Sequence, residues 1–144
     1  MTAALRNVVV LDSNLVVSAF LNPEGMASTA LQLAVEHFDV AASSATLAEL
    51  ADMLKRNKFD RYASKIDRIT RLEAYAQTVL VFDVQLEVAH CKDPKDNKFL
   101  ALCATAGAKV LVTGDKKDLL VMHPYQNTAV LGVRAFVDEH GTYL

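Results

Sequence analysis

The chain has 144 residues, 52% of them hydrophobic and 22% charged, which is typical of one compact globular domain. No apolar run approaches the ~20 residues of a membrane span, and the N-terminus lacks a signal-peptide pattern. The net charge of −2 does not by itself indicate nucleic-acid binding, and Cys91 and Cys103 lack metal-ligand spacing. We therefore expect a reduced, cytoplasmic protein without a membrane segment.

Hydrophobic periodicity and turn residues divide the chain into alternating strands and helices. In chain order we expect a strand at 6–11, helices at 13–21 and 26–37, a strand at 38–42, helices at 44–57 and 61–79, a strand at 79–84, a helix at 95–106, a strand at 110–113, a short helix at 115–121, a strand at 129–131 and a helix at 134–140. This alternation predicts a mainly parallel sheet of four or five strands, covered by helices on both faces as a three-layer α/β/α sandwich.

Acidic residues stand where the chain changes direction. Asp12 directly follows the apolar run 8–11, and Asp115 follows the apolar run that ends at Gly114. Carboxylates at the carboxyl ends of parallel strands point into the crevice where open α/β sheets bind ligands. Holding several carboxylates together is costly unless a hard divalent cation, Mg²⁺ or Mn²⁺, neutralises them. The pattern therefore indicates a metal-dependent reaction on a phosphate.

Each of these two carboxylates also has a plain structural interpretation. Asp12 could cap the helix that follows it by accepting backbone hydrogen bonds. Asp115 could do the same, with Asp118 as its helix partner or as a spare ligand. The position of Asp12 at the end of a buried central strand favours a functional role.

The segment Asp93-Pro94-Lys95-Asp96 opens a helix. Asp93 fits the N-cap, Pro94 the first helical position and Asp96 the third. Asp96 also begins the inward stripe of this helix, which continues through Phe99, Leu100, Cys103 and Ala106. That stripe places Asp96 over the strand ends, so we expect Asp96 to be functional and Asp93 to be a cap.

The spacing of Thr46 and Glu49 allows a capping box, in which Glu49 would bond back to the first helical turn. Glu49 lies off the apolar stripe of its helix, so spacing alone indicates a structural role.

Positive charge is concentrated in residues 55–71, where seven basic and two acidic residues give a net charge of +5. A basic segment beside an acidic pocket suits a polyanion that meets a metal, although a solvated helix face explains the charges equally well. The candidate phosphate contacts are Lys55, Arg56, Lys58, Arg61, Lys65 and Arg68.

Four segments, taken in order, resemble the acidic motifs of PIN domains. They are LDSNLVVSA at 11–19, SATLAEL at 44–50, CKDPKDNKFLAL at 91–102 and VTGDKKDLL at 112–120. The resemblance spans nearly the whole chain. Within the family, the chain most resembles the prokaryotic PIN proteins of toxin–antitoxin pairs, the VapC-like ribonucleases. It implies one PIN-like domain over residues 1–144.

The resemblance implies a Mg²⁺- or Mn²⁺-dependent endoribonuclease. Asp12, Asp96 and Asp115 match the metal ligands, and Glu49 takes the remaining catalytic acidic position, against its spacing-based interpretation. The expected supporting groups are Ser13, Asn14, Asp93, Thr113 and Asp118. The expected partners are an RNA substrate, an antitoxin protein and a second copy of the chain.

The sequence departs from the family pattern at two places. Lys116 and Lys117 together precede Asp118 where relatives often have one residue, and Ala45 stands where a proline is common. Neither change removes a carboxylate.

Two alternatives remain open. One is a non-catalytic PIN-type module that only binds RNA or protein. The other is an aspartate-based phosphotransfer domain, which the sequence favours less. A dehalogenase-like phosphatase has an aspartate where Asn14 stands, and a receiver domain has paired acids where only Asp12 ends the first strand.

Overall fold

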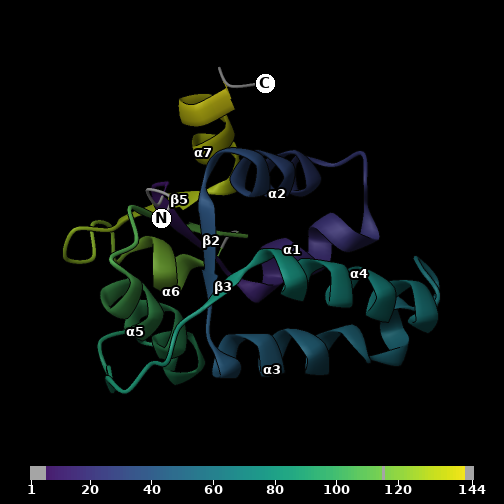
Figure 1. The fold of residues 1–144 in the computed structure, drawn as a ribbon, viewed down its shortest axis with the longest axis horizontal. Coiled ribbons are helices and arrows are strands. Elements are labelled where there is room, and N and C mark those ends of the chain that lie inside the picture. Colours follow the sequence, from purple (N-terminus) through teal and green to yellow (C-terminus); the bar gives the residue numbers. More distant parts are fainter. Residues whose placement is uncertain (1–5, 115, 142–144) are drawn as a thin grey trace, which may run out of the picture.

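The computed structural model describes residues 6–114 and 116–141, which form a five-stranded sheet between two layers of helices (Figure 1). Every neighbouring pair of strands is parallel, and the order across the sheet is β3-β2-β1-β4-β5. The strands are β1 (Val8–Leu11), β2 (Asp39–Ala42), β3 (Leu80–Val81), β4 (Val110–Thr113) and β5 (Ala129–Gly132). The predicted α/β/α sandwich is confirmed.

The helices form two hydrophobic cores, one on each face of the sheet. The first face packs against α1 (Ser13–Leu21), α2 (Met26–His37), α3 (Ser44–Leu54), α4 (Lys65–Thr78) and α7 (Val133–His140). The second face packs against α5 (Asn97–Ala106), α6 (Lys117–Leu120) and parts of the segment 82–91. Two short 3₁₀ turns, η1 (Asn57–Phe59) and η2 (Pro94–Asp96), precede α4 and α5. None of the described helices is long and apolar enough to cross a membrane.

Strand β1 lies in the middle of the sheet, and its side chains serve both cores. Val9 and Leu11 belong to the first core, whereas Val8 and Val10 belong to the second. A strand covered on both faces needs apolar residues at every position, which explains why 8–11 is an uninterrupted apolar run.

The chain leaves β1 and β4 in opposite directions. After β1 it enters α1 on the first face, and after β4 it enters α6 on the second face. The two strands are direct neighbours, and the Asp12 amide donates to the Val112 carbonyl at 3.0 Å. A crevice therefore opens at their carboxyl ends, which is where open α/β sheets bind ligands.

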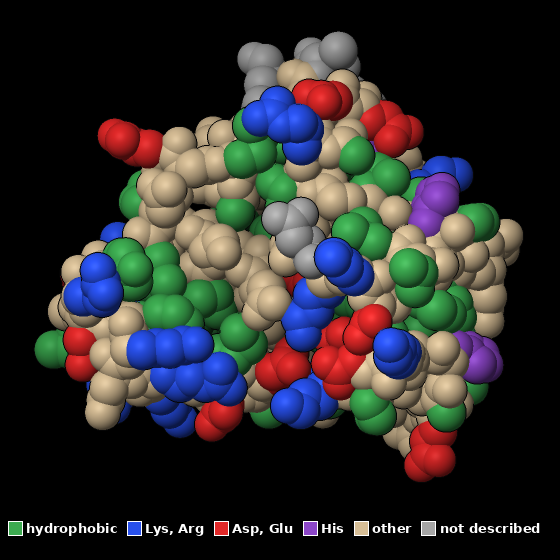
Figure 2. All heavy atoms as spheres, turned by 180° about the vertical axis from the view of Figure 1, so that it is seen from behind, with side chains coloured by type: hydrophobic (Ala, Val, Ile, Leu, Met, Phe, Trp, Pro, Cys, Tyr) green, Lys and Arg blue, Asp and Glu red, His purple; other side chains and the backbone are tan. Residues whose placement is uncertain are grey.

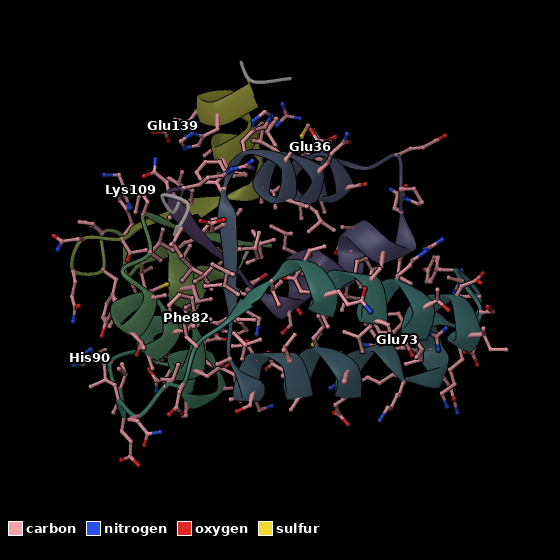
Figure 3. The ribbon with its side chains drawn as sticks, viewed as in Figure 1. Glu36, Glu73, Phe82, His90, Lys109 and Glu139 are labelled. Atoms are coloured by element: carbon pink, nitrogen blue, oxygen red, sulfur yellow. The ribbon has the colours of Figure 1, made fainter. Side chains whose placement is uncertain are left out.

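Several predicted element boundaries were wrong. The predicted helix 44–57 ends at Leu54, and the predicted helix 61–79 begins only at Lys65, because Ser64 caps it by accepting from the Asp67 amide. The predicted strand 79–84 pairs only at Leu80–Val81. Beyond it, the Phe82 amide donates once more to the Ala42 carbonyl of β2 at 2.8 Å, and the side chains of Phe82 (Figure 3) and Val84 pack against the second core.

The apolar spacing within 61–79 predicts an inward face of Ile66, Ile69, Leu72 and Ala76, and the inward face of α4 differs from it. Ile66, which the apolar pattern places inside, is 79% exposed, whereas the side chain of Arg68 is fully buried. The Arg68 guanidinium donates to the carbonyls of Leu54 and Ala63 and pairs with Asp60 at 2.9 Å. Arg68 therefore cannot contact RNA, and that prediction was wrong. It instead satisfies the Leu54 carbonyl at the end of α3, which has no partner within that helix, and the Ala63 carbonyl in the connection before α4.

We expect Arg68→Ala to lower the free energy of unfolding by about 2–3 kcal/mol, because it leaves buried carbonyls without donors. Urea denaturation measures this loss. The matched control is Arg61→Ala on the same segment, whose exposed side chain makes it close to neutral. Equal stability of the two variants would contradict the structural role of Arg68.

Candidate functional site

Asp12 occupies the start of the crevice and is almost completely buried, with 1% of its surface exposed. Its carboxylate accepts hydrogen bonds from the Leu15 amide at 2.9 Å, the Gly114 amide at 3.2 Å and the Thr113 hydroxyl. Burial raises the pKa of Asp12, although these hydrogen bonds and the nearby Lys116 act in the opposite direction. The predicted cap is therefore present, and the same carboxylate lies at the crevice.

Gly114 makes this arrangement possible by its small size. A Cβ atom at this position would lie 3.3 Å from the Leu15 nitrogen, because the chain after β4 runs directly beside the first turn of α1. This close approach brings the Gly114 amide within reach of Asp12. The two strand ends are thus joined through one carboxylate.

Asp93 is the cap that its position predicts, and Asp96 faces inward as its place on the helical stripe predicts. Asp93 caps η2 by accepting from the Lys95 amide at 3.0 Å. Asp96 points inward, is 1% exposed and accepts from Lys116 Nζ at 3.2 Å through Oδ1. Its second oxygen, Oδ2, is buried without a hydrogen-bond partner among the described residues. Burial raises the pKa of Asp96, the contact with Lys116 opposes this shift, and the charges of Asp93 and Glu49 add to it.

Glu49 extends from α3 toward the start of α1. It accepts from the Ser13 hydroxyl at 2.6 Å and from Lys98 Nζ at 3.0 Å. The capping box at the start of α3 is formed by Ser43 and Thr46 instead, so the interpretation of Glu49 as a cap was wrong. The side chain of Glu49 is left to reach the crevice.

Asp12 and Glu49 border a small hollow of about 160 Å³ at the carboxyl ends of the strands, and Asp96 is linked to it through Lys116, which also borders it. Its polar lining includes Asp12, Ser13, Asn14, Glu49, Arg56 and Lys116. Figure 2 shows a face on which acidic and basic side chains lie next to one another in the middle and further basic side chains gather toward one end. The site is therefore a carboxylate cluster interleaved with cations.

Lys116 is the central cation of this cluster. Burial alone would lower its pKa, but the hydrogen bond to Asp96 and the charges of Asp96, Asp12 and Asp93 raise the pKa of Lys116 overall. Sequence reasoning did not identify Lys116 or Lys98 as partners of these acids. The only available signal was their place inside the acidic motifs.

The remaining predicted residues are placed as follows. Thr113 is buried at the end of β4 and holds Asp12, whereas Asp118 lies in the first turn of α6 and is partly exposed. Asp115 lies outside the described residues. Within 6–114 and 116–141, no three His, Cys, Asp or Glu side chains are grouped so as to hold a metal ion.

The donor chemistry nevertheless fits a hard cation. The carboxylates of Asp12 and Asp96 offer only oxygen ligands, which Mg²⁺ and Mn²⁺ prefer. The buried oxygen of Asp96 without a partner is the kind of atom that a bound cation would satisfy.

A parallel α/β sheet with buried carboxylates at its switch point defines the structural class of the protein. Comparison with known proteins identifies the family. A family model described as PIN domain matches residues 8–117, and the chain belongs to this family. The uncharacterized protein MJ1680 of Methanocaldococcus jannaschii is 30% identical over 110 residues, which cover 75% of this chain and 70% of that protein.

Solved structures share the fold at low sequence identity. The DNA-bound VapBC of Salmonella typhimurium has a TM-score of 0.61 at 14% identity and covers 88% of this chain and 98% of its own. VapBC2 of Rickettsia felis, bound to a promoter DNA fragment, has a TM-score of 0.59 at 17% identity, with coverages of 87% and 98%. FitAB bound to the IR36 DNA fragment has a TM-score of 0.54 at 20% identity, with coverages of 87% and 94%.

We expect the metal-free protein to lose stability as the pH rises. Burial raises the pKa of Asp12 and Asp96 above the ordinary value of 3.8, so their protonated forms favour the folded chain. This stability is fully present below the ordinary pKa and is lost as the pH rises through the raised values. Asp12→Asn should remove its share of the pH dependence and stabilise the protein at neutral pH.

Urea denaturation in EDTA from about pH 4 to about pH 8 measures this dependence. Asp52→Asn is the control, because the Asp52 side chain is 80% exposed on α3. A stability that rises with pH, or an Asp12→Asn protein as pH-dependent as the wild type, would contradict the expected burial cost.

Proposed function

We propose that this PIN domain protein is a Mg²⁺- or Mn²⁺-dependent endoribonuclease that hydrolyses phosphodiester bonds in RNA. The observation that carries the proposal is the pair of buried carboxylates, Asp12 at the switch point and Asp96, which is linked to the hollow through Lys116. The buried Asp96 oxygen without a partner among the described residues adds to it. Holding two acids in this state costs stability, and a metal-dependent reaction explains why the fold retains them.

Asp12, Asp96 and Asp115 are the proposed metal ligands. When bound, a divalent cation lowers the pKa of a water molecule and neutralises charge on the phosphate oxygens. Asp12 is held in one orientation by Leu15, Gly114 and Thr113, so little reorganisation is needed to bind the ion.

The other residues of the hollow have distinct proposed tasks. Glu49, fixed by Ser13, accepts a hydrogen bond from the attacking water and orients it. Lys98 and Lys116 neutralise the acids and can turn toward the phosphate once an ion replaces them. Arg56, at the mouth of the hollow, adds a phosphate contact.

The biological setting proposed is that of a toxin in a toxin–antitoxin pair. The structural neighbours VapBC and FitAB are two-component complexes by name, and the sequence motifs resemble the same group. An antitoxin protein and a homodimer of this chain are therefore part of the proposal. Light scattering of the purified chain tests the homodimer directly.

Asp12→Asn and Asp96→Asn should each lower Mg²⁺-dependent RNA cleavage by about a hundredfold or more, because a neutral amide ligates the ion weakly. Cleavage of a generic single-stranded RNA with Mg²⁺ and with EDTA is the measurement. Mn²⁺ should raise the melting temperature of the wild type but not of these variants. Wild-type cleavage by a folded Asp12→Asn protein, with Asp52→Asn as control, would remove Asp12 from the mechanism.

Charge reversal in the basic segment tests how RNA approaches. Arg61→Glu and Lys65→Glu should each weaken RNA binding and reduce the slope of log K against log salt by roughly 0.7 per lost phosphate contact. Lys109→Glu is the matched control, because Lys109 directly precedes β4 at the amino ends of the strands and lies far from α4 (Figure 3). Equal slopes of log K against log salt for all three variants would show that the basic residues of 55–65 are only solvated surface charges.

A further inference from the structure

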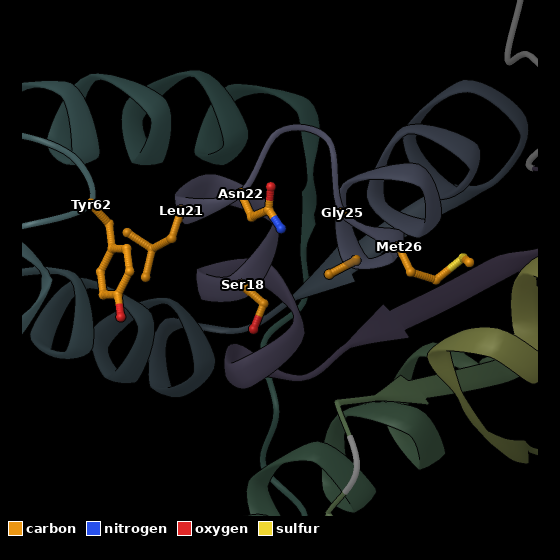
Figure 4. A pocket seen from close by; sticks show the side chains of 7 residues that line it. Ser18, Leu21, Asn22, Gly25, Met26 and Tyr62 are labelled. Atoms are coloured by element: carbon orange, nitrogen blue, oxygen red, sulfur yellow. The ribbon is translucent and has the colours of Figure 1, made fainter.

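A second hollow lies at the other end of α1, outside the acidic site. It has a volume of about 460 Å³, and its lining includes Ser18, Leu21, Asn22, Gly25, Met26 and Tyr62 (Figure 4). Pockets of this size hold small organic ligands. Two of its large apolar side chains are exposed, Met26 at 38% and Tyr62 at 59%.

Helix α1 connects this hollow to the acidic one. Asn14 lines the acidic hollow and Ser18 lines the second. Residues four positions apart share one face of a helix and are separated by a rise of about 6 Å. The segment after α3 makes the same connection, since Arg56 borders the acidic hollow and Tyr62 the second. The two hollows are therefore neighbours along one surface.

The lining combines a stacking surface with hydrogen-bond donors. Tyr62 presents an exposed aromatic ring, and the Arg61 guanidinium lies 5.1 Å from the centre of that ring. The Asn22 Oδ1 accepts from the Glu24 amide at 3.3 Å, which leaves Nδ2, on the side of Gly25, as the free donor of this amide (Figure 4). Neither Asn22 Nδ2 nor the Ser18 hydroxyl donates a hydrogen bond within the described part of the chain, so both are available to a ligand.

Gly25 keeps this arrangement open. A Cβ atom at Gly25 would lie only 2.8 Å from Asn22 Nδ2, so any larger residue would push the amide away. Donors and an aromatic ring that line one hollow, with Leu21 next to the ring (Figure 4), suit a flat ligand whose edge carries acceptors, as the carbonyl and ring-nitrogen atoms of a nucleobase do.

We propose that this hollow binds one nucleobase of a single-stranded RNA, next to the phosphate that occupies the acidic site. The assignment rests on the proposed ribonuclease function and extends it to base selection. The base stacks on Tyr62, and its acceptor edge receives hydrogen bonds from Ser18 and Asn22. The adjoining segment carries the cations Lys58, Arg61 and Lys65, which complement the charge of an RNA backbone. This positive charge favours RNA over an uncharged apolar peptide as the ligand.

The test uses fluorescent single-stranded RNA octamers and the full chain carrying Asp12→Asn, which does not cleave RNA under the proposed mechanism, so that binding is measured alone. A series of octamers carries a single abasic ribose, each at a different position. At one of these positions the missing base should weaken binding roughly five- to a hundredfold, the usual effect of losing one base–aromatic stack, and at the others it should not. Tyr62→Ala should weaken binding of the intact octamer equally and abolish the effect of that abasic position.

The controls separate stacking from general damage. Tyr62→Phe should retain the abasic profile, and Ile66→Ala, which removes an exposed side chain outside this hollow, should leave binding unchanged. Asn22→Ala and Ser18→Ala should change the preference among homopolymeric octamers, because they remove edge contacts rather than the stack.

The outcomes distinguish this proposal from the ribonuclease function itself. A flat abasic profile, or an unchanged profile in Tyr62→Ala, would overturn the base site, and the hollow would then belong to a different ligand such as a protein segment. If the base site is overturned but the wild type still cleaves the same octamers in parallel, the proposed ribonuclease function is retained. Absence of both binding and cleavage would overturn both proposals.

Discussion

The site depends on one costly arrangement, the burial of Asp12 at the point where two neighbouring strands send the chain to opposite faces. The carboxylate accepts from both chain segments that leave this point, through Leu15 on one side and Gly114 with Thr113 on the other. These hydrogen bonds offset part of the desolvation cost and also join β1 to β4. The same side chain is therefore a structural link and the first ligand candidate.

The acids are not left without positive charge. Lys116 pairs with Asp96 and Lys98 pairs with Glu49, so each of these carboxylates has a cation from within the chain. The lysine side chains of both pairs are partly exposed, Lys98 at 26% and Lys116 at 30%. Water therefore screens both ion pairs, and a bound cation can replace the lysines. A divalent ion would compete with these ammonium groups rather than enter an uncompensated pocket. The affinity for the ion then depends on the difference in free energy between carboxylates paired with lysines and the same carboxylates bound to the ion.

The sequence predicted those parts of the fold that follow from local pattern. The strand order was not predicted. The buried first strand was predicted at 6–11 from its continuous apolar run and is found at Val8–Leu11, and the inward position of Asp96 was predicted from the helical spacing of the apolar residues that follow it. Glu49 could not be placed by spacing, since Ser43 forms the capping box one turn earlier and only the family resemblance indicated its position.

Arg68 and Lys116 show the limit of such patterns. Charged residues normally lie at the surface, so the apolar spacing of α4 predicts Ile66 inside and Arg68 outside. The contact between Lys116 and Asp96 joins residues 20 positions apart and depends on how α5 and the β4–α6 connection meet. Neither local periodicity nor charge counts contain that information.

The buried arginine also connects the fold to the proposed RNA surface. Arg68 holds the carbonyls of Leu54 and Ala63 and the carboxylate of Asp60, and these groups span the whole connection from α3 to α4. That connection carries Arg56 at the acidic hollow and Tyr62 at the second one. A long exposed loop would pay a large ordering entropy to bind RNA, whereas a loop fixed from beneath presents its cations and its aromatic ring already in place. Arg68 thus serves RNA binding in the proposed mechanism by positioning other residues, although it can touch no RNA itself.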